Sequence, residues 1–373
     1  MKISSVNLYH LRMALRSPFE TSFGRIDTRD CILLEARSGD QAGELVGYGE
    51  CVADRDPGYS YETVETAWHV LKDFILPAVI DQEVEHPQDV QGLVAGVRGH
   101  QMAKAGLEMA FWDLKGKQES RSLRQMLGGQ RENVEVGVSV GIQETPEKLL
   151  KVVEGYLAQG YRRVKIKIKP GRDIVETKMI RQAFPQLRLQ VDANSAYTLE
   201  AALALKPLDE LDLLLIEQPL YEDDIWEHHY LQEQLVTPIC LDESILSVRH
   251  ARQALEMGAC RIINIKAGRV GGLSQAVAIH DFCQERGAPV WCGGMLETGV
   301  GRASNLALAS LPGFLLPGDI SASERYYLED ITEQRFTLNP ESTITVPTAP
   351  GLGVTVDRAA LDRATLKRLT VTS

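Results

Sequence analysis

Charged residues stand at the ends of five consecutive short apolar runs in the middle of the chain. The runs read RRVKIKI, LRLQVDAN, LLLIEQPL, PICLDES and RIINIKAG, and their charged residues are Lys165, Lys167, Asp192, Glu217, Asp242 and Lys266. Each residue alone has an ordinary explanation, since an aspartate after a strand often caps a helix and a lysine can extend its amine to the surface. Five such runs in succession are harder to explain in that way, and we interpret the charged residues as one site.

The three carboxylates of this set, Asp192, Glu217 and Asp242, indicate a metal site. Carboxylates that converge repel one another and raise one another's pKa unless a cation lies between them. Ligation by oxygen alone suits Mg²⁺, with Mn²⁺ as the alternative ion. No histidine or cysteine accompanies the three acids, which argues against zinc.

The lysines indicate acid–base chemistry. In RVKIKIK the lysines alternate with Val and Ile, which is typical of a strand with one cationic face; a solvent-exposed face is the ordinary alternative. A lysine that acts as a base near neutral pH needs a pKa of about 7–8, some 3 units below its usual value of about 10.4. We expect Lys165 and Lys167 to lower the pKa of whichever lies deeper, and Arg269 to act similarly on Lys266. Two amines beside a metal-bound carboxylate fit abstraction of a proton α to that carboxylate, with the enediolate stabilised by the metal.

The composition of the chain excludes several classes of protein. The 373 residues are 44% hydrophobic and 24% charged, which is ordinary for a globular protein. A net charge of −11 argues against a nucleic-acid surface but leaves a small anionic carboxylate substrate open. The six cysteines show no C-x-x-C pair, and the start of the chain lacks a signal-peptide core. No apolar run approaches the roughly 18 residues of a membrane span. We therefore expect a cytoplasmic protein.

The elements that must position these residues follow from the periodicity. Residues 1–125 predict an antiparallel sheet followed by helices: 2–13 and 31–38 alternate like strands, and 60–79 and 99–118 carry helical periodicity. Residues 16–30, RSPFETSFGRIDTRD, are predicted to be a polar loop.

From about residue 134 eight short apolar runs follow one another, roughly 24 to 30 residues apart, with amphipathic helical segments between them. Strands that alternate with helices in this way predict a parallel sheet with crossover helices. Eight runs fit a closed barrel better than an open doubly wound sheet, and barrels place their chemistry at the carboxyl ends of the strands. The residues after about 325 again indicate strands and turns, which we expect to pack on the N-terminal part.

The order K-x-K, D-x-N, E-Q-P, D-E-S and N-I-K resembles the muconate-lactonizing subgroup of the enolase superfamily. The runs GHQMAKAGLEMAFWDL, CGGMLETGVGRASN and GDIS are similar, more narrowly, to the o-succinylbenzoate synthase / N-succinylamino acid racemase family. This resemblance implies a (β/α)7β modified TIM barrel at 126–325, with an α+β capping domain formed by 1–125 and by the tail, 326–373.

The resemblance also implies roles for individual residues. One Mg²⁺ ion would bind Asp192, Glu217 and Asp242, while Lys167 and Lys266 would form the acid–base pair and Lys165 would assist at the carboxylate. A loop near the N-terminus closes over the substrate in this family, which makes Phe19 and Phe23 candidate apolar walls; packing between the two domains is the alternative. The other predicted substrate-binding residues are Ser139, Asn194, Arg269, Met295, Ile320 and Ser321. Met295 can equally be a core residue.

The implied function is dehydration of 2-succinyl-6-hydroxy-2,4-cyclohexadiene-1-carboxylate to 2-succinylbenzoate in menaquinone biosynthesis. Racemisation of N-succinylamino acids is the close alternative, and one protein can carry both activities. A dipeptide epimerase is disfavoured because those relatives carry D-x-D where this chain has GDIS. A non-catalytic metabolite-binding barrel would be expected to lack at least one of the charged residues, and none is missing. The resemblance further implies a homo-oligomer.

Overall fold

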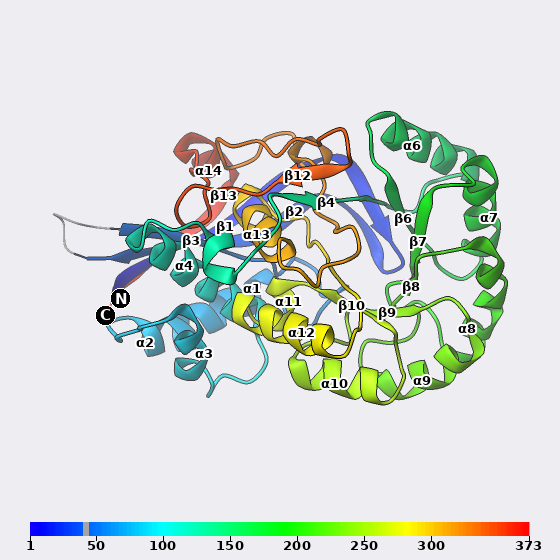
Figure 1. Cartoon of the computed structure of the whole chain (residues 1–373). Helices are drawn as coiled ribbons and strands as arrows, with labels where there is room; N and C mark the ends of the chain where they lie inside the picture. The colour runs from blue at the N-terminus through cyan, green and yellow to red at the C-terminus, as the bar shows by residue number, and fades with distance from the viewer. Residues whose placement is uncertain (40–44, 373) are drawn as a thin grey trace.

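The computed structural model describes residues 1–39 and 45–372, which form a capping region and a barrel (Figure 1). The capping region contains an antiparallel sheet in the order β13-β1-β2-β3. Its strands are β1 (Ile3–Thr21), β2 (Gly24–Ser38), β3 (Leu45–Cys51) and β13 (Thr365–Thr372). Its helices are α1 (Val64–Val70), the π-helical turn η1 (Leu71–Ile75), α2 (Leu76–Val79), η2 (Pro87–Asp89), α3 (Val90–Leu93), α4 (Gln101–Gln118) and α5 (Leu123–Leu127).

The barrel contains a curled parallel sheet in the order β11-β10-β9-β8-β7-β6-β5. Its strands are β5 (Val138–Val140), β6 (Arg163–Lys167), β7 (Arg188–Asp192), β8 (Ile216–Glu217), β9 (Ile239–Leu241), β10 (Ile262–Ile265) and β11 (Val290–Cys292). The connecting helices are α6 (Pro146–Ala158), α7 (Ile174–Ala183), α8 (Leu199–Ala202), η3 (Leu203–Leu211), α9 (Ile225–Gln234), α10 (Val248–Glu256), α11 (Ala267–Val270), α12 (Leu273–Glu285) and α13 (Gly299–Ala309). The fold class predicted from the sequence is confirmed.

The eighth predicted strand closes the barrel without forming a regular strand. Phe314 makes a parallel bridge to Val290 of β11, and Gly318 makes one to Val136 on the other side. Backbone hydrogen bonds support both sides, from Asp319 N to Cys292 O (2.9 Å) and from Gly137 N to Gly318 O (2.8 Å). The segment thus joins the first and last strands of the sheet.

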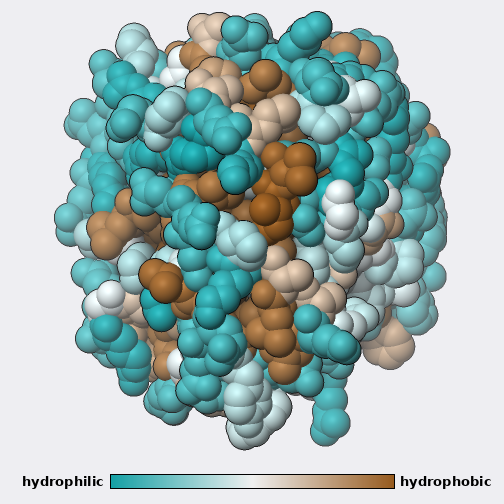
Figure 2. Space-filling model, turned by 90° about the vertical axis from the view of Figure 1, so that its right-hand side faces the viewer, coloured by the Kyte–Doolittle hydropathy of each residue, from teal (hydrophilic) through white to brown (hydrophobic). Residues whose placement is uncertain are grey.

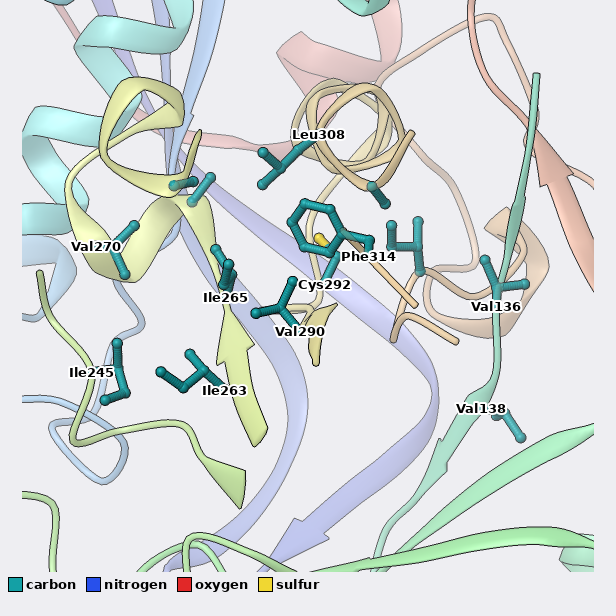
Figure 3. Packing of buried hydrophobic residues seen from close by; sticks show 14 of the residues in the cluster. Val136, Val138, Ile245, Ile263, Ile265, Val270, Val290, Cys292, Leu308 and Phe314 are labelled. Atoms are coloured by element: carbon teal, nitrogen blue, oxygen red, sulfur yellow. The ribbon is translucent and has the colours of Figure 1, made fainter. Parts of the chain in front are cut away.

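Apolar side chains fill the space between the sheet and the surrounding helices. Val290 and Cys292 of β11 lie beside Leu308 of α13 and Phe314 (Figure 3). The face seen in Figure 2 carries the outer surfaces of barrel helices and is mainly hydrophilic, with some apolar residues gathered along its middle. All six cysteines are buried and unpaired. No helix among the described residues is long and apolar enough to cross a membrane.

Residues 16–30 differ from the prediction of a polar loop. β1 and β2 continue as one long hairpin, with the pairs Phe19↔Ile26, Glu20↔Arg25 and Thr21↔Gly24 next to the turn. The tip contacts the barrel, since Ile142 N donates to Glu20 O (2.9 Å) and Ser22 Oγ donates to Asn194 O (2.9 Å). The prediction was wrong because these residues are polar by composition, while their strand pairing depends on contacts far along the chain. Figure 1 shows the hairpin reaching from the capping region to the barrel strands.

The tail contributes η4 (Ser323–Arg325), β12 (Thr343–Thr345), α14 (Arg358–Ala364) and β13. β13 pairs with β1, so the two ends of the chain lie side by side, whereas β12 pairs with β4 (Asn133–Glu135). The domain boundaries at residues 125 and 325 stay a prediction.

Close packing of α4 on β3 depends on Gly49 of β3. A Cβ at Gly49 would lie 1.9 Å from the carbonyl oxygen of Gly106. This contact leaves no room for a side chain, so the spacing between helix and sheet requires glycine at Gly49.

Candidate active site

The predicted metal-binding carboxylates lie at the ends of three neighbouring strands. Lys167 of β6 pairs in register with Asp192 of β7, and Asp192 pairs with Glu217 of β8. Asp242 follows β9, the next strand in the sheet. All three carboxylates are buried. Parallel strands end at the same edge of a sheet, and the structure brings these side chains together at the barrel mouth.

Lys165 lies deepest and bridges several acids. Its Nζ is 3.0 Å from Asp192 Oδ2, 2.8 Å from Glu217 Oε2 and 2.7 Å from Asp319 Oδ2. Asp319 also accepts from Arg163 Nη1 at 2.6 Å. Lys165 therefore holds together acids from β7, β8 and the segment that closes the barrel.

Lys167 and Lys266 face the barrel mouth from opposite sides of the acids. Lys167 Nζ donates to Asp192 Oδ2 and Asn194 Oδ1, both at 2.6 Å. Lys266 Nζ, after β10, donates to Asp242 Oδ2 at 2.7 Å and to the Tyr59 hydroxyl at 3.1 Å. Three strands separate β6 from β10, and these are the strands that carry the carboxylates.

Arg269 lies behind Lys266. Its guanidinium forms an ion pair with Asp242 and donates to the backbone oxygens of Ile245 (2.8 Å) and Asn264 (2.6 Å). Asp242 Oδ1 also accepts from the Tyr59 hydroxyl at 3.0 Å. Arg269 and Tyr59 thus fix the orientation of Asp242.

The lysines differ in their pKa. Burial lowers the pKa of Lys167 below its ordinary value. For Lys165 burial acts in the same direction, but Asp319, Glu217 and Asp192 outweigh it and raise the pKa. The pKa of Lys266 is likewise raised, because Tyr59 and nearby carboxylates outweigh burial.

The predicted lowering of pKa is therefore wrong for the deeper lysine of the pair, which is Lys165. It is wrong also for Lys266 beside Arg269, because the negative neighbours of both lysines dominate.

A cavity of about 180 Å³ opens above this cluster. Lys167 and Lys266 line it from the barrel, Tyr59 lines it from the loop after β3, and the tip of the β1–β2 hairpin forms another wall. Four of the predicted substrate-binding residues border the cavity, namely Phe19, Phe23, Asn194 and Met295.

The other predicted substrate-binding residues do not border this cavity. Ile320 and Ser321 are buried, and Ser321 Oγ donates to the Gly137 carbonyl at 3.0 Å. Ser139 Oγ is buried without a hydrogen-bond partner in the described part of the chain. Arg269 is buried and contacts Asp242. The roles of these four residues in binding stay predictions.

The donor set fits a hard divalent cation by its chemistry. Within residues 1–39 and 45–372 no three acidic, histidine or cysteine side chains already surround a common point, because the carboxylates accept from lysines instead. The Lys165 ammonium nevertheless lies between Asp192 and Glu217, so a positive charge at this place reaches both. One oxygen of the neighbouring Glu243 is buried without a hydrogen-bond partner in the described chain. The residues fit Mg²⁺, a hard cation that prefers oxygen ligands.

Sequence reasoning assigned no role to Tyr59 or Asp319. Asp319 lies in the GDIS run, so the sequence indicated that this position matters, but it did not predict the contact with Lys165. Tyr59 precedes Lys266 by 207 residues, and no spacing in the sequence connects them.

Comparison with known proteins places the chain in a class. Residues 148–360 match the family described as "Enolase C-terminal domain-like", and residues 3–128 match the "Mandelate racemase / muconate lactonizing enzyme, N-terminal domain". A solved structure of a member of the enolase superfamily from Listeria innocua is 44% identical, with a TM-score of 0.94, over 100% of this chain and 99% of that one.

Two relatives define the family more narrowly. An o-succinylbenzoate synthase from Geobacillus stearothermophilus is 51% identical over 98% of this chain and 96% of its own length. An N-succinylamino acid racemase from Amycolatopsis sp. is 49% identical over the full length of both chains. The chain therefore belongs to the o-succinylbenzoate synthase / N-succinylamino acid racemase family of the enolase superfamily.

Proposed function

We propose that the protein is an o-succinylbenzoate synthase, which dehydrates 2-succinyl-6-hydroxy-2,4-cyclohexadiene-1-carboxylate to 2-succinylbenzoate. Racemisation of N-succinylamino acids is the second activity that the same site supports. Relatives with both names share about half of their residues with this chain, and both reactions begin with loss of a proton α to a carboxylate.

The observation that carries this proposal is the placement of two lysines on opposite sides of three acids. Lys167 and Lys266 line one cavity, and the strands between them end in Asp192, Glu217 and Asp242. A substrate carbon held in that cavity is reached by an amine from either face. A binding protein without catalysis has no need of this arrangement.

In dehydration, Lys167 Nζ removes the α-proton and then delivers a proton to the leaving hydroxyl on the same face. Burial lowers the pKa of Lys167 and so makes its ammonium easier to deprotonate, as a general base requires. Lys266 stays cationic beside the ring, held by Asp242 and Tyr59. In racemisation, Lys266 must also exchange a proton with the substrate, so both lysines change their protonation state.

Asp192, Glu217 and Asp242 would hold one Mg²⁺ ion, with Mn²⁺ as the alternative. Such an ion, when bound, neutralises the substrate carboxylate and the further negative charge that develops when the α-proton leaves. Lys165 adds a fixed positive charge beside Asp192 and Glu217. Phe19 and Phe23 supply apolar walls to the pocket. The cytoplasmic location and the homo-oligomer are part of the proposal; sedimentation tests the latter.

Lysine variants test the proposal. We expect Lys167→Ala to lower both activities by about 10²- to 10⁴-fold, the usual contribution of a general base. Lys266→Arg keeps the positive charge but cannot act as a base near neutral pH. It should therefore retain more dehydration than Lys266→Ala, whereas both variants should lose racemisation.

The measurements are turnover of both substrates and exchange of the α-proton with deuterium in D₂O. If the wild-type protein, supplied with Mg²⁺, exchanges the α-proton of neither substrate, the proposed function is wrong. If Lys266→Arg and Lys266→Ala lose dehydration equally, Lys266 does not act through its charge alone.

A further inference from the structure

The substrates of the proposed function carry two carboxylates, one at the reacting carbon and one at the end of the succinyl group. A cavity that holds the whole substrate must offer the second carboxylate a cation or hydrogen-bond donors. Among the described residues, four cationic residues line the cavity: Arg25, Arg29, Lys167 and Lys266. Lys167 and Lys266 already face Asp192 and Asp242 and serve the reacting end.

The guanidinium of Arg29 is already paired with groups of the protein. Its Nε donates to the Met295 carbonyl at 3.1 Å, and its Nη1 lies 3.0 Å from Asp54 Oδ1. The same guanidinium donates to the backbone oxygens of Asp30 and Val52. Only 3% of Arg29 is exposed, and all of these partners belong to the protein. Arg29 therefore links the hairpin to the capping region and the barrel, and its guanidinium is not free to bind a substrate carboxylate.

Arg25 differs from these three cations because its guanidinium has no partner among the described residues. Within residues 1–39 and 45–372 it makes no hydrogen bond or ion pair, and its side chain is exposed. Glu20 lies directly opposite Arg25 in the hairpin and would be its natural partner. Lys169 engages Glu20 instead, at 3.6 Å.

The hairpin holds Arg25 at the mouth of the barrel. Ser22, three residues before Arg25, donates to the backbone oxygen of Asn194, which itself contacts Lys167. The backbone of Glu20 accepts from Ile142 on the other side of the hairpin. Arg25 therefore sits on a segment whose backbone is tied to the barrel at two points.

We propose that Arg25 binds the second carboxylate of the substrate and thereby determines specificity for succinyl compounds, an inference that rests on the proposed function. The guanidinium offers paired donors in a planar arrangement that matches a carboxylate. Dicarboxylates are accordingly selected over neutral compounds of the same shape.

The experiment compares two substrates that differ only in charge: the N-succinyl and N-succinamoyl derivatives of one amino acid, in which a terminal amide replaces the carboxylate. We measure kcat and KM for racemisation by the wild-type protein and by Arg25→Gln and Arg25→Lys. We expect Arg25→Gln to lower the ratio of kcat/KM for the succinyl over the succinamoyl compound by about tenfold, mainly through KM. Arg25→Lys should retain part of the preference. In the dehydration assay, Arg25→Gln should raise KM by a similar factor.

Lys148→Gln is the matched control. Lys148 lines a neighbouring cavity that Arg25 also borders, but not the catalytic one. We expect its ratio to equal that of the wild-type protein. An unchanged ratio in Arg25→Gln, or an equal change in Lys148→Gln, overturns the role of Arg25 while wild-type turnover still supports the proposed function. A wild-type protein that acts on neither substrate class overturns both.

Discussion

Carboxylates are buried in two regions of this molecule, and their neighbours differ. At the barrel mouth, Asp192 and Asp319 face the ammonium of Lys165, and Asp319 also faces Arg163. Between the capping region and the barrel, Glu50 and Glu108 face backbone N–H groups where barrel helices begin. Glu50 accepts from Thr298 N (3.1 Å) and Gly301 N (3.0 Å) at α13, and Glu108 accepts from Ser274 N (3.3 Å) at α12.

The carboxyl groups of the two regions differ in their pKa. Burial raises the pKa of all four carboxyls, but cationic neighbours outweigh burial for Asp192 and Asp319 and hold their pKa low. For Glu50 and Glu108 the hydrogen bonds offset only part of the burial, and the pKa rises to about 7. Cationic side chains therefore stabilise the carboxylate anions at the barrel mouth. Between the capping region and the barrel, backbone N–H dipoles at the starts of helices stabilise the carboxyls instead.

The largest effect should follow from breaking a charged contact at the barrel mouth. Asp319→Asn removes the partner of Arg163, which is completely buried, and one of the three acids around Lys165. We expect the free energy of unfolding to fall by about 3–5 kcal/mol, because a buried cation is left without its counter-charge. Denaturant unfolding at neutral pH measures this change. A fall below about 1 kcal/mol would show that other groups or water can replace Asp319.

The sequence predicts contacts between the ends of successive strands, but it does not predict contacts between residues far apart in the chain. The lysines and acids at the strand ends were predictable, because parallel strands bring consecutive run ends to one mouth. The contact of Tyr59 with Asp242 joins residues 183 apart, and the sequence does not connect them. The hairpin at 16–30 was read as a loop because Pro18, Gly24 and polar residues are turn signals, while its pairing depends on docking to the barrel. The raised pKa of Lys165 depends strongly on Asp319, whose contact with Lys165 the sequence did not predict.

A second prediction concerns the interface and pH. Glu50 and Glu108 have a higher pKa in the folded chain (about 7) than the ordinary 4.5, so the folded state binds more protons than the unfolded state. The stability that this uptake provides is complete below about pH 4.5 and is lost as the pH rises through about 7. A shift of this size corresponds to about 3 kcal/mol per group.

Glutamine variants isolate this contribution because glutamine does not ionise. Between pH 5 and pH 8, the unfolding free energy of Glu50→Gln and of Glu108→Gln should each decline less than that of the wild-type protein. Glu154→Gln, at an exposed position of α6, is the control and should follow the wild-type curve. Parallel curves for all four proteins would mean that neither glutamate changes its protonation in this range.

The smallest effect should come from a carboxylate that is paired but exposed. Glu329 accepts from Arg363 Nη2 at 2.7 Å and from Arg363 Nε at 3.1 Å, so both of its oxygens are paired, as both oxygens of Asp319 are. More than half of each side chain is exposed, so water competes with the contact and salt screens it. We expect Glu329→Gln to change the free energy of unfolding by less than about 1 kcal/mol, and a double-mutant cycle with Arg363→Gln to give a coupling energy of the same small size. A coupling that approached the effect of Asp319→Asn would mean that contact geometry, rather than burial, sets the strength of these charged contacts.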